Sequence, residues 1–189
     1  MLVSKVLWID TETTGTDPVI HDVIQIGCVM ELAGVPCFER EWKCAPINKE
    51  YVTEEILKFH GIKREDLLNL PDPRSVKNAF ESFISSYVDK FNKQDKIVLA
   101  GFNTKFDYDM LRSWFGKLGD KYFGSWFFWS VIDVANELAK YAAYKGLRLR
   151  NMKLGTCCEH FGIPIRAHDA LSDIKATRDL YLRLTRETI

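Results

Sequence analysis

The chain has 189 residues, 47% of them hydrophobic, which is enough to bury the core of one domain and short for two. Its 26 basic and 26 acidic residues give zero net charge, which excludes a protein that holds a polyanion through a strong overall positive field. The 5 cysteines lack zinc-type spacing, and no leader-like or membrane-spanning apolar run is present, so we expect one domain over residues 1–189 that is soluble, cytoplasmic and without a membrane partner.

The first third of the chain predicts three strands and a short helix. Val6 to Ile9 is an apolar run typical of a buried strand, and two more strand segments follow at Asp22 to Leu32 and Cys37 to Cys44. The turn residues between the last two favour an antiparallel start to the sheet. Thr53, followed by two glutamates, indicates a helix N-terminus, and the helix should end near His60 and Gly61.

The rest of the chain alternates helices and strands. Ser75 to Phe91 has one apolar face at helical spacing, and Ile97 to Ala100 is a short buried strand. The remaining predicted elements are a helix over Asn103 to Trp114, a fifth strand over Trp126 to Ile132, and helices over Val134 to Tyr144, Met152 to Phe161 and Asp169 to Thr185. The order βββαβαβα predicts an α/β fold with a five-stranded mixed sheet flanked by helices.

Two carboxylates end the first strand. Residues i and i+2 of an extended chain point to the same side, so Asp10 and Glu12 can converge on one point. An Asp-x-Glu pair alone is more often solvated or capping than metal-binding. Held together, the two anions repel by about 4 kcal/mol at about 4 Å and an effective dielectric near 20. A divalent metal ion would relieve that repulsion.

Three ordered motifs extend this pair. They are Asp10-Thr11-Glu12-Thr13-Thr14-Gly15 with Asp22-Val23-Ile24-Gln25-Ile26-Gly27 downstream, then Asn103-Thr104-Lys105-Phe106-Asp107, and last His168-Asp169-Ala170-Leu171-Ser172-Asp173, with a softer match at His60-Gly61-Ile62. With these motifs the chain resembles the DEDDh 3′-to-5′ exonucleases, the DnaQ-like branch of the ribonuclease H-like fold. The resemblance extends from residue 3 to about residue 180, and three motifs in order are far more specific than one Asp-x-Glu.

The resemblance implies a two-metal phosphodiesterase site. Asp10 would bridge two Mg²⁺ or Mn²⁺ ions, Glu12 and Asp173 would complete one metal site, and Asp107 would serve the second. His168 would take the proton of the attacking water, since an imidazole with a pKa of about 6.5 is largely neutral at pH 7. The expected substrates are single-stranded DNA or RNA 3′ ends, the product is a nucleoside 5′-monophosphate, and a polymerase is a candidate partner.

Several residues are candidates for substrate contacts, the first three through the resemblance and the others through their chemistry, and most have a structural alternative. Thr13, Thr14 and Gly15 would contact the terminal nucleotide, or form a plain turn. Asn103 and His60 are further substrate-contact candidates, and Phe106 would stack on a base or pack in the core. From Leu138 to Cys158 the chain holds Lys140, Lys145, Arg148, Arg150 and Lys153 with no acid, so this stretch could guide a single strand or simply be solvated.

Three other aspartates are predicted to lie outside the site. Asp109 is about 200° around a helix from Asp107, and Asp133 and Asp169 each precede a predicted helix, where capping is the better interpretation. Two other functions compete with the exonuclease: a non-catalytic docking module that keeps the fold, and an endonuclease of the ribonuclease H type. The intact set of acids and the position of His168 five residues before Asp173 favour the exonuclease.

Overall fold

The computed structural model describes residues 4–166 and 169–186. Its sheet has the strand order β3-β2-β1-β4-β5. The strands are β1 (Lys5–Thr13), β2 (Val23–Leu32), β3 (Val35–Lys43), β4 (Val98–Gly101) and β5 (Ile132–Asp133). The first three pair antiparallel, whereas β4 is parallel to β1 and β5 is parallel to β4. The predicted mixed sheet of five strands is therefore confirmed for the part of the chain that the structure describes.

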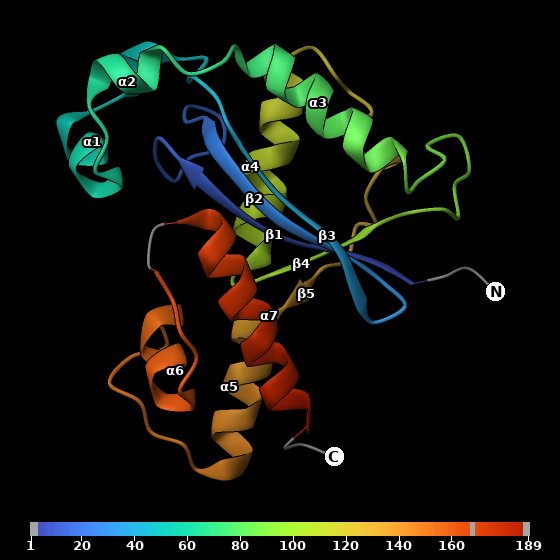
Figure 1. Cartoon of the computed structure of the whole chain (residues 1–189), viewed down its shortest axis with the longest axis vertical. Helices are drawn as coiled ribbons and strands as arrows, with labels where there is room; N and C mark the ends of the chain where they lie inside the picture. The colour runs from blue at the N-terminus through green and yellow to red at the C-terminus, as the bar shows by residue number, and fades with distance from the viewer. Residues whose placement is uncertain (1–3, 167–168, 187–189) are drawn as a thin grey trace.

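Helices cover both faces of this sheet (Figure 1). One face carries α3 (Pro73–Ser85) and α4 (Thr104–Lys117), and the other carries α5 (Val134–Lys145), α6 (Leu154–Phe161) and α7 (Ala170–Arg186). The short helices α1 (Glu54–His60) and α2 (Arg64–Leu68) form a small cluster of their own around buried Leu57 and Leu67. The sequence did not predict α2. Single turns of 3₁₀ helix occur at Lys49–Tyr51 and Phe123–Ser125.

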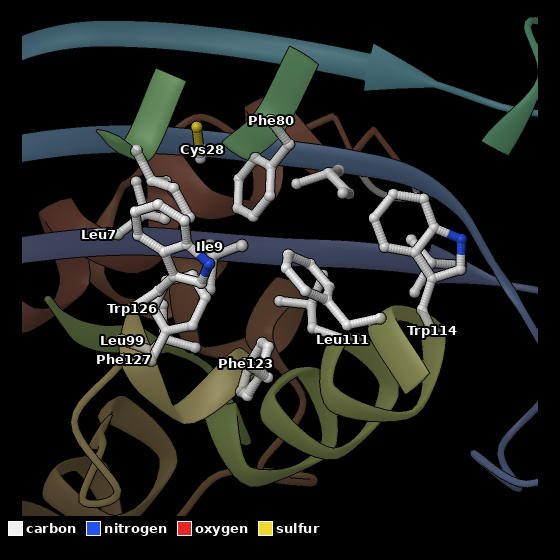
Figure 2. Close-up of a cluster of buried hydrophobic side chains, with 14 of the residues drawn as sticks. Leu7, Ile9, Cys28, Phe80, Leu99, Leu111, Trp114, Phe123, Trp126 and Phe127 are labelled. Carbon is white, nitrogen blue, oxygen red and sulfur yellow. The ribbon is translucent and has the colours of Figure 1, made fainter. Parts of the chain in front are cut away.

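The larger apolar core lies between the sheet and helices α3 and α4. Leu7 and Ile9 of β1 point into it, where they meet Phe80 of α3 and Leu111 of α4 (Figure 2). Between them, Trp8 points to the opposite face and packs with α5, α6 and α7. This alternation follows from the two-residue period of a strand. It continues past Ile9, so Asp10 and Glu12 are on the same side of β1 as Trp8.

Two predicted elements differ from the structure. The fifth strand was predicted over Trp126 to Ile132, but β5 is only Ile132–Asp133, and Phe127 makes an isolated bridge to Ile97. Four residues, 128–131, lie opposite the two residues 98–99, so the chain bulges away from the sheet at this point. The helix predicted to reach Phe91 ends at Ser85. The chain beyond it forms turns, in which the side chains of Asp89 and Asn92 accept backbone N–H groups two residues further on.

Gly27 lets α7 approach the sheet closely. It pairs with Asp10 across β1 and β2, and a Cβ placed on it would lie 2.4 Å from the backbone carbon of Ala170 at the start of α7. A contact that short forces backbone to move, because real Cβ atoms essentially never approach another heavy atom to under 3.0 Å. The absence of a side chain at Gly27 therefore sets how close the first turn of α7 lies to Asp10.

We expect Gly27→Ala to lower the free energy of unfolding by about 1–3 kcal/mol, the usual range for overpacking. Urea denaturation followed by circular dichroism measures this change. Gly155→Ala is the matched control, because a Cβ at Gly155 meets no atom within 4 Å and alanine favours a helix. A Gly27→Ala protein as stable as the wild type would show that α7 can shift at no cost.

Candidate functional site

Three carboxylates meet at the end of β1. Asp10 and Glu12 come from the strand, Asp173 comes from the first turn of α7, and one oxygen of each lies within 4.8 Å of the others. The strand period places Asp10 and Glu12 on one side, as the sequence predicted, and the approach of α7 at Gly27 brings Asp173 over them. Among the described residues, no other group of three or more acids, histidines or cysteines comes close enough together to hold a metal ion.

Asp107 lies beside this cluster in the first turn of α4 and is 3% exposed. Its Oδ1 accepts two hydrogen bonds from Thr11, one from the backbone N–H at 2.9 Å and one from Oγ1 at 2.7 Å. Thr11 lies between Asp10 and Glu12 and therefore points to the opposite side of β1, toward α4. The sequence analysis did not identify Thr11 as a site residue. The available signal was its place between two site acids on a strand whose other face packs on a helix.

The four carboxylates share one electrostatic environment. Burial raises the pKa of Asp10 well above the usual 3.8, and the charges of Asp107, Glu12 and Asp173 raise it further. Burial also raises the pKa of Asp107 to about 7, although the two hydrogen bonds from Thr11 act in the opposite direction. With no cation present, this end of the sheet therefore holds protons at a pH where ordinary aspartates have lost them. A divalent cation would compete with those protons.

His60, the last residue of α1, contacts the same strand end. Its Nε2 donates a hydrogen bond to the carbonyl oxygen of Thr13 at 2.9 Å, and its Nδ1 lies 3.3 Å from Oε2 of Glu12. The imidazole is largely buried, with 9% of its side chain exposed. The sequence interpretation placed His60 among the substrate contacts. In the structure its ring nitrogens face Thr13 and Glu12, which fits a residue that orients Glu12.

Hydrogen bonds between buried groups fix the segment after Glu12. Thr14 is fully buried, its N–H donates to the carbonyl of Asp22, and its Oγ1 accepts from the N–H of Asp22. The carboxylate of Asp22, also fully buried, accepts from Lys117 at 2.9 Å and from the backbone of Asn48 at 2.6 Å. The N–H and the Oγ1 of Thr14 are thus both hydrogen-bonded inside the protein, which gives Thr14 a structural role, and its contact with the nucleotide stays a prediction. Thr13 is also buried and donates its hydroxyl to the carbonyl of Gly15 within the turn, at 2.8 Å.

Asn103 and Phe106 lie at the start of α4, next to Asp107. Asn103 has a left-handed backbone with φ of 63°, is exposed, and donates its N–H to Asp133 at 2.9 Å. Asparagine tolerates this conformation better than most residues, and such strain is often found at functional sites. Phe106 is half-buried against the larger core. Core packing is thus confirmed for Phe106, and part of its ring remains accessible.

The three excluded aspartates behave as predicted. Asp133 caps α5 by accepting the N–H of Ala135, and Asp169 accepts the N–H of Ser172 in the first turn of α7. Asp109 pairs with Lys105 on the exposed side of α4. His168 lies outside the described residues. The acid-free basic stretch forms the second half of α5, the loop after it and the first turn of α6.

The sequence matches an exonuclease family model and resembles part of two bacterial DNA polymerases. The family model RNase_T, described as an exonuclease, matches residues 7–181. The DNA polymerase III PolC-type of Thermotoga maritima is 31% identical over 93% of this chain, and that of Halalkalibacterium halodurans is 28% identical over 99%. The chain spans only 11% and 12% of the length of these two relatives. None of the described helices is both long enough and apolar enough to cross a lipid bilayer.

Solved structures of exonuclease I share the fold. One superimposes with a TM-score of 0.76 at 20% identity and covers 97% of this chain and 41% of its own. The zinc-bound form of the E. coli exonuclease I complex with single-stranded DNA has a TM-score of 0.73 at 20% identity, over 98% of this chain and 40% of its own. The complex with a dT13 oligonucleotide has a TM-score of 0.72 at 20% identity, over 98% of this chain and 41% of its own. At this identity the likeness establishes the ribonuclease H-like fold.

Proposed function

The chain belongs to the RNase_T exonuclease family, and from this premise we propose that it is a DEDDh-type, metal-dependent 3′-to-5′ exonuclease acting on single-stranded ends. The observation that carries the proposal is the convergence of Asp10, Glu12 and Asp173 within 4.8 Å, with Asp107 buried beside them. Residues from three separate parts of the chain meet at one strand end. A solvated surface would not gather four anions in this way, because each raises the energy of ionising the others.

The donor set fits two hard divalent cations. All four side chains offer carboxylate oxygens, which Mg²⁺ and Mn²⁺ prefer. Asp10 would bind both ions, Glu12 and Asp173 would complete one site, and Asp107 would serve the other. When bound, the ions supply an activated water and stabilise the leaving 3′ oxygen. The zinc-bound form of exonuclease I supports a divalent-metal site in this fold.

The remaining roles belong to residues around the acids. We assign His168 as the general base that accepts the water's proton, because an imidazole is largely neutral at pH 7 and His168 precedes Asp173 by five residues in the motif. His60 would keep Glu12 in one orientation through its contacts with Glu12 and Thr13. Thr13, Thr14, Gly15, Asn103 and Phe106 are the proposed contacts with the terminal nucleotide, with the backbone carbonyl of Thr14 as its available group.

Single-stranded DNA or RNA 3′ ends are the proposed substrate. The relatives of the PolC type support a polymerase as a partner, and the complexes of exonuclease I with single-stranded DNA support the form of the substrate. The PolC-type relatives and exonuclease I are both much longer than this chain. They are therefore used to choose the substrates for the test.

The proposal is tested with 5′-labelled DNA and RNA oligomers, single- and double-stranded, incubated with Mg²⁺ or with a chelator. We expect a ladder that shortens one nucleotide at a time from the 3′ end of single strands, release of nucleoside 5′-monophosphates, and no reaction with chelator. Circular single strands should resist. Equal cutting of circles and linear strands would instead indicate an endonuclease, and binding without hydrolysis would indicate a non-catalytic module.

A further inference from the structure

We infer that a second surface, separate from the site formed by the four carboxylates, binds the single strand upstream of its 3′ end. This α5–α6 surface consists of Lys140, Tyr144 and Lys145 of α5, Arg148 of the following loop, and Lys153 at the start of α6. The inference rests on the proposed function, because the strand that it holds is the one that enters the acidic site. It names a longer strand, beyond the terminal nucleotides, as the favoured substrate.

Three of the four cations on this surface are available for a ligand. Lys145, Arg148 and Lys153 are exposed, and no carboxylate of the described residues lies within ion-pair distance of any of them. The fourth cation, Lys140, lies 3.7 Å from Glu137, and outside this surface Arg150 lies 2.9 Å from Glu159, so these two charges are compensated. In a chain of zero net charge, a phosphate backbone must be held by such local groups of cations.

An aromatic ring and a groove accompany these cations. Tyr144 has 82% of its surface exposed, so its ring is accessible for stacking. Next to it, between α5 and the end of α7, is a groove of about 640 Å³. Its lining includes the cations Lys140 and Lys145, the ring of Tyr144 and one acid, Glu137, which lies 3.7 Å from Lys140. Bases stack on exposed aromatic rings while nearby cations track the backbone, and every base has a face that can stack. An acidic protein segment would use the cations alone, so these features favour a nucleic-acid strand.

The chain connects this surface to the acidic site at both ends. Helix α5 begins directly after Asp133, whose carboxylate accepts the N–H of Asn103 beside the start of α4. Beyond α6 the chain returns to α7, whose first turn carries Asp173. Helices α5, α6 and α7 lie together on one side of the sheet (Figure 1). A twelve-residue α5 is about 18 Å long, which corresponds to about five nucleotides at the spacing within one strand of a duplex.

Binding of labelled oligo-dT strands of four and twenty nucleotides, followed by fluorescence anisotropy in chelator, tests this inference without hydrolysis. We expect Lys145→Ala/Arg148→Ala to weaken binding of the long strand about tenfold at low salt and to reduce the slope of log affinity against log salt by about 1.4. Tyr144→Ala should weaken it about fivefold, with less effect on the slope. Binding of the short strand should not change.

Matched controls distinguish binding at the α5–α6 surface from a general effect of removing positive charge or a tyrosine. Lys93→Ala/Lys121→Ala removes two exposed cations that also have no ion-pair partner among the described residues, and Tyr122→Ala removes a tyrosine that is 73% exposed. Neither should alter binding of the long strand. Equal losses in control and test variants, or equal losses for both strand lengths, would overturn the inference. So would unchanged strand binding together with tight binding of a labelled poly-glutamate peptide, which would assign the surface to an acidic protein.

Hydrolysis of the four-nucleotide strand with Mg²⁺ keeps the two proposals apart. If the wild type and all variants hydrolyse it at one rate while long-strand binding falls as expected, both proposals hold. If neither the wild type nor any variant hydrolyses the strand, the proposed function fails. The anisotropy result then still decides whether the α5–α6 surface binds a strand. If hydrolysis is present and long-strand binding is the same in all variants, only the α5–α6 inference fails.

Discussion

Asp10→Asn is expected to lower metal-dependent nucleotide release by about 10³-fold or more. Asp10 is the carboxylate whose pKa burial raises and which the charges of Asp107, Glu12 and Asp173 all raise further, so it lies at the centre of the acidic cluster. Asparagine keeps the shape of the side chain but removes the negative charge and one of the two carboxylate oxygens. Initial rates on a short single strand, measured over a range of Mg²⁺ concentrations, give the change.

Asp109→Asn is the matched control for this loss. Asp109 carries the same charge and lies near Asp107 in sequence, but it pairs with Lys105 on the exposed side of α4. Its rate should stay within about twofold of the wild type, because a surface ion pair contributes little. Wild-type turnover by Asp10→Asn would remove Asp10 from the metal site and defeat the two-metal assignment.

Asp107→Asn is expected to stabilise the metal-free protein at pH 8 by about 1–3 kcal/mol. Burial raises the pKa of Asp107 from 3.8 to about 7, so the folded protein holds a proton there that the unfolded chain has lost. Stability from this group is therefore present below about pH 4 and is lost as the pH rises to about 7. Asparagine stays neutral throughout, and its carbonyl oxygen can still accept both hydrogen bonds from Thr11.

Chemical denaturation in chelator at pH 4 and pH 8 measures this effect. The variant and the wild type should differ little at pH 4 and clearly at pH 8, and Mn²⁺ should stabilise the wild type more than the variant, because a ligand stabilises the state that binds it. Asp109→Asn again serves as the control. A loss of stability in Asp107→Asn at pH 8 would contradict this expectation, because it would mean that the ionised carboxylate gains more from its hydrogen bonds with Thr11 than its burial costs.

Prediction from sequence worked best where one local period decided the outcome. The buried run before Asp10 predicted β1, and capping chemistry correctly removed Asp133 and Asp169 from the site. The prediction of the fifth strand was wrong in its bounds, because aromatic residues such as Phe127 and Trp129 occur both in strands and in segments that bulge away from a sheet, as residues 128–131 do. Which of the two forms depends on the neighbouring strand β4, whose pairing the local sequence does not encode.

The same division holds for the candidate site. The sequence alone determined that Asp10 and Glu12 share a side of β1, because alternation along a strand is a property of two successive peptide units. Only the tertiary structure decided that Thr11 holds Asp107, across a separation of 96 residues, and that His60 faces Glu12 instead of open solvent. Such contacts depend on how closely helices pack against the sheet, which at α7 is set by the missing side chain of Gly27.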